Sequence, residues 1–182
     1  MAERFKELKE KQIEFIKQQH IFFVGTAGAE GTVNVSPKGM DTLRIINERK
    51  VVWLNLTGSG NETSVHVQEN RRMTLMFCSF EKQPLILRLY GKANVIHTRD
   101  SKWKELSSLF DKYVSARQFF QLNIELVLKS CGFGVPFFEY RGERESAIKW
   151  AKSRGRDGIE EWWKEKNQIS LDGKPTNILK NA

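Results

Sequence analysis

The distribution of hydrophobic residues along the chain predicts a structure built mainly from β-strands. Short runs rich in β-branched and aromatic residues, bounded by glycine, proline and polar residues, are typical of strands. Such runs occupy residues 21–24, 33–36, 51–56, 73–77, 85–97 and 124–129. Gly91 interrupts the longest run and predicts a bulge or a bend there. Because short turns separate most of the runs, we expect antiparallel pairing.

Apolar residues at helical spacing predict helices at both ends of the chain and between the strands. These helices cover residues 2–19, about 59–69, 101–112, 144–154 and 159–167. Ser59 and Glu62 have the spacing of a capping box, and Gly155 and Gly158 separate the last two helices. Residues 171–182 lack a clear period, so we expect an irregular tail there.

The order of these elements predicts a mainly β fold with flanking helices, arranged as an antiparallel barrel with helical caps. The length of 182 residues and the hydrophobic content of 40% are those of a globular chain with one main core. We expect one domain over residues 1–140, including the N-terminal helix. A helical extension over residues 141–182 is expected to pack on the same domain.

The net charge of +8 favours anionic partners, from phosphorylated small molecules to nucleic acid. Basic residues, however, alternate with acidic ones in runs such as Lys-Glu-Leu-Lys-Glu-Lys at 6–11. A nucleic-acid surface is usually more clustered, so nucleic-acid binding is not expected. The charge is equally consistent with a basic protein that merely stays soluble.

Cysteine and histidine positions indicate no disulfide framework and no metal site. The two cysteines, Cys78 and Cys131, lie in apolar stretches and are expected to be reduced and partly buried. The three histidines do not have metal-ligand spacing with each other or with the cysteines. The N-terminus is charged, and no apolar stretch approaches the ~20 residues of a membrane span. We therefore expect a cytoplasmic protein without membrane association.

A Gly-rich segment at 57–63 is the first candidate for a binding site. Gly58 lets the backbone approach a ligand, Ser59 and Thr63 offer hydroxyls, and Asn61 offers an amide. Thr63 would lie in the first turn of the following helix, whose N–H groups favour anions. The segment is neither a Walker loop nor a GxGxxG loop. Its composition fits a phosphate site and an ordinary capped turn equally well.

The second candidate is the sequence Ser36-Pro37-Lys38-Gly39. Pro37 interrupts regular pairing, Gly39 permits a close approach, and Lys38 supplies a positive charge to an anion. A β-bulge that carries a solvated lysine explains the same residues and is the simpler interpretation.

Three further features have weaker chemical signals. Arg88 lies in an apolar run and either reaches the rim of the sheet or pairs with an anion. Cys131 begins a Gly- and Pro-rich loop that is more typical of a pocket lining than of a nucleophile, because no His–acid partner is evident. Trp150, Trp162 and Trp163 lie at helical spacing and favour core or dimer packing over base stacking.

Five segments in order resemble one known family. They are Val-Asn-Val-Ser-Pro-Lys-Gly at 33–39, Val-Val-Trp-Leu-Asn at 51–55, Gly-Ser-Gly-Asn at 58–61, Glu-Asn-Arg-Arg-Met at 69–73 and Arg-Leu-Tyr-Gly-Lys-Ala at 88–93. Together they resemble the pyridoxamine 5′-phosphate oxidase-like family of FMN-binding split barrels, over about residues 1–135. The C-terminal part, at 131–136 and 173–175, is similar to a poorly characterised subgroup of that family.

The resemblance implies a six-stranded antiparallel Greek-key split β-barrel with an FMN cleft at a homodimer interface. It places the strand of Ser36, Pro37 and Lys38 beside the isoalloxazine ring. It also implies that Lys38, Ser59, Asn61 and Arg88 hold the phosphate. The predicted cofactor-binding set is completed by Gly39, Thr57, Gly58, Thr63 and Cys131.

Two departures from the family pattern argue against oxidation of pyridoxamine phosphate itself. Authentic oxidases usually carry a lysine near the place of Asn61 in the phosphate loop. They also carry an Arg-Leu-x-Pro type motif near the C-terminus, whereas residues 170–176 read Ser-Leu-Asp-Gly-Lys-Pro-Thr here.

The expected function is that of an FMN-dependent oxidoreductase acting on an unknown small molecule with an unknown electron donor. Hydride transfer at a flavin needs no acid, base or nucleophile from the protein, which agrees with the lack of an evident catalytic set. The alternatives are a split barrel that binds haem or a deazaflavin, and a non-catalytic nucleic-acid-binding module, whose affinity would fall steeply with salt.

Overall fold

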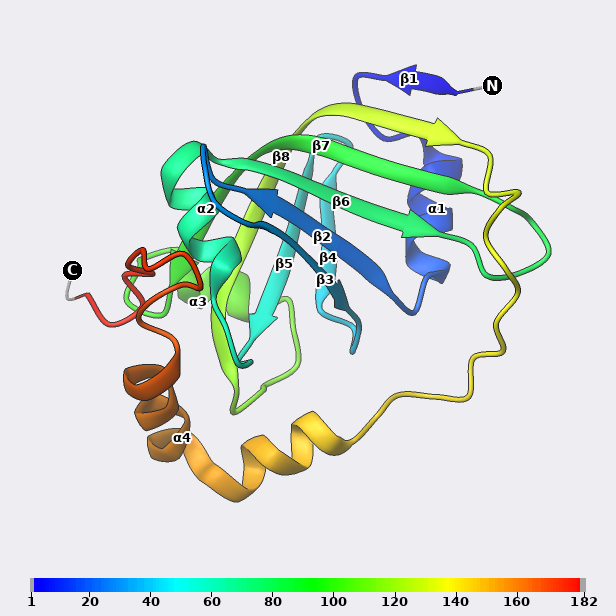
Figure 1. Cartoon of the computed structure of the whole chain (residues 1–182). Coiled ribbons are helices and arrows are strands. Elements are labelled where there is room, and N and C mark those ends of the chain that lie inside the picture. Colours follow the sequence, from blue (N-terminus) through cyan, green and yellow to red (C-terminus); the bar gives the residue numbers. More distant parts are fainter. Residues whose placement is uncertain (1, 181–182) are drawn as a thin grey trace.

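The computed structural model describes residues 2–180 as one antiparallel sheet with helices around it (Figure 1). The strands are β1 (Glu3–Phe5), β2 (Phe22–Ala27), β3 (Val33–Lys38), β4 (Leu43–Asn47), β5 (Lys50–Leu56), β6 (Arg72–Cys78), β7 (Ile86–His97) and β8 (Ala116–Ser130). The helices are α1 (Glu10–Gln18), α2 (Glu62–Asn70), α3 (Trp103–Ser107) and α4 (Ser146–Lys166). The strands pair in the order β3-β2-β6-β7-β8-β5-β4, and β1 pairs with β8.

The long strands β7 and β8 form the centre of the sheet and allow it to curve. Their register shifts between Tyr90 and Gly91, which confirms the predicted irregularity. A Cβ atom at Gly91 would collide with the carbonyl oxygen of Asn123, so only glycine fits where the strands approach there. The first half of β8 pairs with β5, and its last residues pair with β1.

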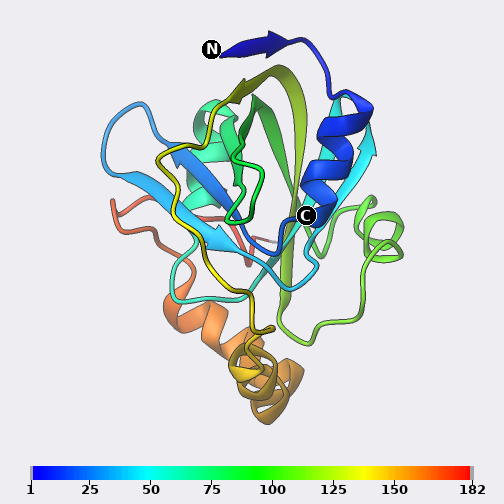
Figure 2. The ribbon, with the colours of Figure 1, turned by 90° about the vertical axis from the view of Figure 1, so that its right-hand side faces the viewer.

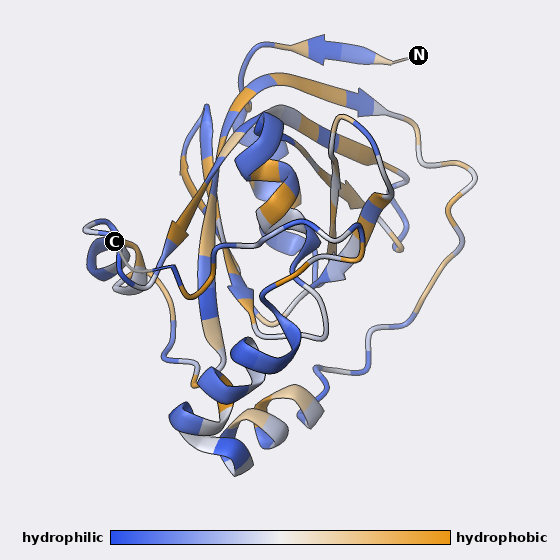
Figure 3. Cartoon of the chain, turned by 60° about the vertical axis from the view of Figure 1, so that its left-hand side comes forward, coloured by the Kyte–Doolittle hydropathy of each residue, from blue (hydrophilic) through white to orange (hydrophobic). Residues whose placement is uncertain are grey.

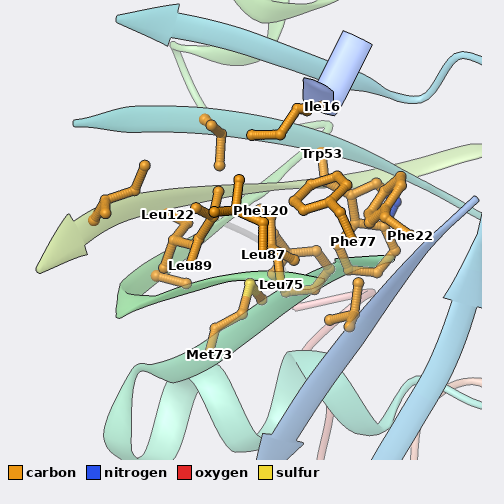
Figure 4. Close-up of a cluster of buried hydrophobic side chains, with 14 of the residues drawn as sticks. Ile16, Phe22, Trp53, Met73, Leu75, Phe77, Leu87, Leu89, Phe120 and Leu122 are labelled. Carbon is orange, nitrogen blue, oxygen red and sulfur yellow. The ribbon is translucent and has the colours of Figure 1, made fainter. Parts of the chain in front are cut away.

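The main core fills the concave side of the curved sheet and is closed by α1 (Figure 4). Trp53 stacks on Phe120 with ring centroids 5.0 Å apart, and Phe22 stacks on Phe77 at 5.7 Å. Ile16 reaches this cluster from the apolar side of α1, whose remaining surface is hydrophilic (Figures 3 and 4). A smaller cluster lies under α3, and a third joins α4 to the tail through Ile159, Trp163 and Ile178.

The mainly β architecture with flanking helices is confirmed, but the sheet contains eight strands and is not closed. The structure does not confirm a six-stranded Greek-key barrel. Two short strands, β1 and β4, were not predicted. The helix predicted from residue 2 is wrong at its start, because residues 3–5 pair with 127–129 and Phe5 packs against the core.

Other boundaries also differ from the pattern-based expectation. β3 continues through Pro37, which is tolerated because β3 lies at the edge of the sheet and needs no donor on its free side. β8 begins eight residues before the predicted residue 124, and α3 is shorter than residues 101–112. The helix α2 begins at Glu62 with Asn61 as N-cap, so the capping box of Ser59 and Glu62 is wrong.

The chain from β8 to α4 has no regular structure and passes the beginning of β2, where Tyr140 stacks on His20 (Figures 1 and 2). Its residues 131–145 are mostly exposed, including Phe133, Phe137 and Phe138. Gly155 has a φ of 64° and interrupts α4, which confirms the predicted division into two helical parts. The interruption lets the second part turn toward the loop between β5 and α2.

Candidate anion-binding site

The loop at 57–61 connects the end of β5 to the start of α2, where backbone N–H groups are free to meet an anion. Thr57 anchors its beginning, because its N–H donates to the carbonyl of Ser115 at 2.8 Å and its hydroxyl donates to the same carbonyl. Nothing lies within 4 Å of where a Cβ of Gly58 would be, so a ligand can approach the backbone there. Ser59 is exposed.

Asn61 is the residue whose surroundings most clearly require a ligand. Its side chain is 2% exposed, yet among the described residues neither its Nδ2 nor its Oδ1 has a hydrogen-bond partner. It also makes no side-chain cap to α2. A buried polar group without a partner costs about 1–3 kcal/mol, so such a group usually has a ligand or a water nearby. The amide nitrogen can donate to an oxyanion.

The carbonyl oxygens of the loop accept hydrogen bonds from side chains of the protein and do not point toward the side from which a ligand would approach. Gly58 O accepts bonds of 3.1 Å from both Trp162 Nε1 and Asn167 Nδ2. Ser59 O accepts from Asn167 Nδ2 at 3.3 Å, and Gly60 O accepts from Arg117 Nη1 at 2.9 Å. Because these oxygens are engaged, they repel an approaching anion less.

Arg117 lies directly behind the loop, buried at the start of β8, and it was not predicted from the sequence. Its Nη1 also donates to Asn167 Oδ1 at 2.8 Å, and Asn55, with its amide turned to suit, accepts from Nη2 at 2.9 Å. Burial lowers the pKa of Arg117, but even a value of about 9 leaves the guanidinium charged at neutral pH. Among the described residues its partners are all neutral oxygens, so its charge stays available to an anion.

Lys38 is the second cation of the site. Every second side chain of β3, namely Asn34, Ser36 and Lys38, points to the concave side of the sheet. Asn34 Nδ2 donates to Thr63 Oγ1 of α2 at 3.1 Å. Lys38 Nζ lies 5.1 Å from the ring centroid of Trp53. Burial, and then the charge of Arg117, lowers the pKa of Lys38 to about 8. Among residues 2–180, no ion pair includes Lys38 or Arg117.

The structure turns the side chains of two predicted site residues, Pro37 and Arg88, to the outer face of the sheet and places a third, Cys131, at the far end of β8. Arg88 pairs with Met76, Met76 with Phe23, and Phe23 with Pro37, so these four side chains share the outer face of the sheet. Lys38 pairs with Phe22 and lies on the other face. Arg88 Nη1 donates to the Ser130 hydroxyl at 3.2 Å.

Cys131 follows β8 at the end opposite Ala116, which pairs beside the loop, so it lies far from Asn61. It is exposed, and the expectation that both cysteines are partly buried is therefore wrong for Cys131. Trp163 is buried, as the packing interpretation predicts, and its Nε1 donates to Thr57 Oγ1 at 2.8 Å.

Comparison with known proteins identifies the family. The family model of pyridoxamine 5′-phosphate oxidase matches residues 8–131, which is more than half of the chain. The chain belongs to the pyridoxamine 5′-phosphate oxidase family. A relative in Aspergillus flavus, the pyridoxamine 5′-phosphate oxidase family protein ustO, is 33% identical over 189 residues, covering 94% of this chain and 76% of the relative.

Two solved structures resemble this member of the family in fold. A putative pyridoxamine 5′-phosphate oxidase from Lactobacillus delbrueckii is 20% identical with a TM-score of 0.54, covering 68% of this chain and 94% of that one. HupZ of Group A Streptococcus is 17% identical with a TM-score of 0.52, covering 65% and 91%. At these identities the likeness shows a shared fold.

A cavity of about 570 Å³ lies between α1 and the turn after β3 in this family member, and no residue of the loop at 57–61 lines it. Its walls include Phe22, Gly39 and Tyr113, and Tyr113 donates to the carbonyl of Met40 at 2.8 Å. Met40 and Asp41 both have a positive φ, at 62° and 53°, so the turn after Lys38 is held in an unfavourable backbone conformation. The residues of this turn, Met40 and Asp41, line the cavity.

The described part of the chain contains no cluster of three or more potential metal-ligating side chains. Within residues 2–180, no helix combines the length and the apolar character needed to cross a bilayer.

Proposed function

We propose that the protein binds FMN through the anion-binding site and acts as a flavin-dependent oxidoreductase on a small molecule. The observation that carries the proposal is the arrangement of Lys38, Arg117 and Asn61. Within residues 2–180, neither cation has an acidic partner and the buried amide of Asn61 has no hydrogen-bond partner. Arg117 donates to Gly60 O, next to Asn61, and lies close enough to Lys38 for its charge to lower the pKa of that lysine. A phosphate dianion would compensate both charges and accept a hydrogen bond from the amide. Membership of the family makes FMN the phosphorylated ligand to test first.

The protein groups that would hold FMN divide into two sets. Asn61, Ser59 and the N–H groups at the start of α2 would bind the phosphate directly, with Lys38 as the counter-charge. The free edge of β3, around Pro37, would offer unpaired backbone groups to the polar edge of the ring. When bound, FMN supplies the redox chemistry, and these residues orient it and exclude water.

A homodimer is part of the proposal, because the outer face of the sheet carries exposed apolar side chains. Val33 and Val35 on edge strand β3 are 72% and 65% exposed. Arg88 lies on this same face and cannot reach the phosphate of its own chain. A contribution of Arg88 to the site therefore requires a second copy of the chain. A cytoplasmic location belongs to the same proposal and rests on the sequence alone.

The surroundings of the three histidines argue against haem as the ligand, because each histidine ring already has a contact within the protein. His66 and His97 are buried, and their Nδ1 atoms lie 3.0 Å from the Thr26 hydroxyl and 3.4 Å from Gln118 Nε2. His20 stacks on Tyr140 with ring centroids 3.6 Å apart. A Soret band on titration with haem would contradict this interpretation.

The decisive test is a fluorescence titration of the full chain with FMN and with riboflavin, which lacks the phosphate. We expect FMN to bind at micromolar concentration and riboflavin to bind at least about tenfold more weakly, a difference of about 1.4 kcal/mol. Lys38→Gln should lower the FMN affinity, whereas Lys82→Gln, which removes an exposed lysine, should not. If no FMN binding is detected even at about 100 times the micromolar concentration expected here, the flavin proposal is refuted.

A further inference from the structure

We infer that Asn167, at the C-terminal end of α4, is the positioning residue of the anion-binding loop. This inference rests on the proposed phosphate site and deepens it. Asn167 has 0% exposure and belongs to the C-terminal part of the chain, outside the 8–131 segment that the family model matches. It does not contact the open side of the loop, so it acts through the loop rather than on the ligand.

The amide of Asn167 joins three parts of the site with both of its polar atoms. Its Nδ2 donates to Gly58 O and Ser59 O, at 3.1 and 3.3 Å. Its Oδ1 accepts from Arg117, whose same nitrogen donates to Gly60 O. One side chain thereby fixes the direction of two successive carbonyls and the position of the cation behind the third. No other residue type of this size offers both a donor and an acceptor in this geometry.

The amide is itself held in place by the segment that follows it. The hydroxyl of Thr176 donates to the backbone carbonyl of Asn167, and Thr176 N donates to Gln168 O at 2.8 Å. The carbonyl of Thr176 accepts from Ser64 Oγ and Gln68 Nε2 of α2, at 3.1 and 2.8 Å. The tail therefore fixes Asn167 relative to the same helix whose N-terminus faces the ligand.

Further contacts join this tail to the other wall of the site. Leu171 N donates to both carboxylate oxygens of Glu62, the first residue of α2, at 3.1 and 3.0 Å. Asp172 accepts from Thr32 N at 2.9 Å, just before β3 begins. Residues 162–178, which we name the brace, thus contact the loop, α2 and the β2–β3 turn (Figure 1).

The brace matters because a Gly-Ser-Gly loop is costly to order. Fixing one backbone residue costs about 1–2 kcal/mol, and glycine loses more freedom than other residues. Hydrogen bonds from Asn167, Trp162 and Arg117 order the loop during folding, so a ligand does not have to do so. The same bonds turn the carbonyl oxygens away from the incoming anion. The inference thus predicts an effect specific to the phosphate group of the ligand.

The test compares Asn167→Ala with Gln168→Ala, a change at the adjacent exposed residue, whose side chain bonds only to the carbonyl of Lys164. Calorimetry measures binding of three probes to each full-length protein: FMN, riboflavin and inorganic phosphate. We expect Asn167→Ala to weaken FMN and inorganic phosphate at least tenfold and to leave riboflavin within twofold. Gln168→Ala should change none of the three. Trp162→Phe, which removes only the Nε1–H bond to Gly58 O, should weaken FMN severalfold and keeps the test valid if Asn167→Ala does not fold.

The outcomes separate this inference from the flavin proposal. If the wild type binds FMN, and Asn167→Ala and Trp162→Phe bind FMN with the same affinity as the wild type, the positioning role is refuted and the flavin proposal stands. Equal losses for FMN and riboflavin would also refute it, because they indicate general structural damage. If the wild type binds inorganic phosphate but not FMN, and Asn167→Ala weakens phosphate, the positioning role stands without flavin. Binding of neither probe by the wild type overturns both.

Discussion

Arg88 and Arg117 are both arginines in β-strands, but they lie on different faces of the sheet and in different surroundings. Arg88 is partly exposed on the outer face and donates to the hydroxyl of Ser130. Arg117 is 4% exposed and donates only to neutral oxygens of the loop and its neighbours. The difference shows that an arginine in an apolar run is informative only together with its face and its partners. An arginine that is buried and has no acidic side chain as a partner is the one expected to interact with an anion.

Replacing each arginine in turn tests this comparison and should give the largest effect. Arg117→Met removes the buried charge and leaves Gly60 O and Asn167 Oδ1 without their donor, so we expect FMN affinity to fall about 100-fold and stability to fall by about 2–4 kcal/mol. Arg88→Gln should lower FMN affinity tenfold or less. Titration with FMN and urea unfolding measure both. Equal losses of affinity in the two variants would contradict the distinction between the faces.

The pH dependence of binding sharpens the role of the inner-face cations. Lys38 has a pKa of about 8 in the free protein, and a bound phosphate favours its charged form. FMN affinity should therefore be constant from about pH 6, where the phosphate becomes doubly charged, to pH 8, and then fall by up to about tenfold per pH unit. Lys38→Arg stays charged and should remove the fall above pH 8.

Riboflavin provides the control for this experiment, because its binding should not follow the charge of Lys38. A wild-type FMN affinity that stays constant from pH 8 to 9.5 would show that Lys38 does not face the phosphate.

A buried polar layer beneath the loop is formed by Ser64, His97 and Gln118, whose side chains are joined by hydrogen bonds. This layer predicts loss of stability in acid. Burial, and then the charge of Arg99, lowers the pKa of His97 to about 4. As the pH falls below about 6.5, His97 becomes protonated in the unfolded chain but stays neutral in the folded protein. The contribution of His97 to the free energy of unfolding is therefore complete above pH 6.5 and is lost as the pH falls toward 4. We expect a loss of about 2–3 kcal/mol, measured by urea unfolding. His97→Asn should show a smaller slope over this range, and an unchanged slope would contradict the assignment.

A substitution on the outer face should have the smallest effect on the free energy of unfolding and the largest effect on the association of two chains. Val35 is 65% exposed, so Val35→Glu should change the stability of a single chain by less than about 0.5 kcal/mol. If this face joins two copies, a charge there should shift the protein from dimer to monomer in sedimentation experiments. Val114→Glu, which changes another exposed valine that lies outside the strands, is the matched control. A wild-type monomer at micromolar concentration would remove the dimer from the proposed function.

The strands that bury one face were predictable because their apolar residues produce a clear pattern. β5 is buried along most of its length, and β7 alternates between buried and partly buried positions over most of its length. The first half of β8 was missed because Arg117 and Gln118 interrupt the apolar run, although both are buried. Gln118 belongs to the buried polar layer beneath the loop and Arg117 donates to Gly60 O of the loop, so the part of β8 that serves the site is the part that lacks a strand pattern.

The loop at 57–61 was predictable from its glycines and hydroxyls, but its environment was not. Asn61 was identified by residue type, whereas its lack of a partner is visible only in three dimensions. The separation of Arg88 from Lys38 follows from strand register, which depends on contacts far apart in the sequence. The division into a domain over residues 1–140 and a helical extension over residues 141–182 that packs on the same domain stays a prediction.

The bond between Asn167 and Gly58 joins positions 109 residues apart, and this has a consequence for synthesis. A ribosome makes the strands and the loop first, and domains fold progressively from the N-terminal side as the chain emerges. The sheet can pair before the brace exists, but the loop cannot be fixed until the last helix and tail are released. A nascent chain stalled before residue 162 should therefore contain a folded sheet that does not yet retain phosphate.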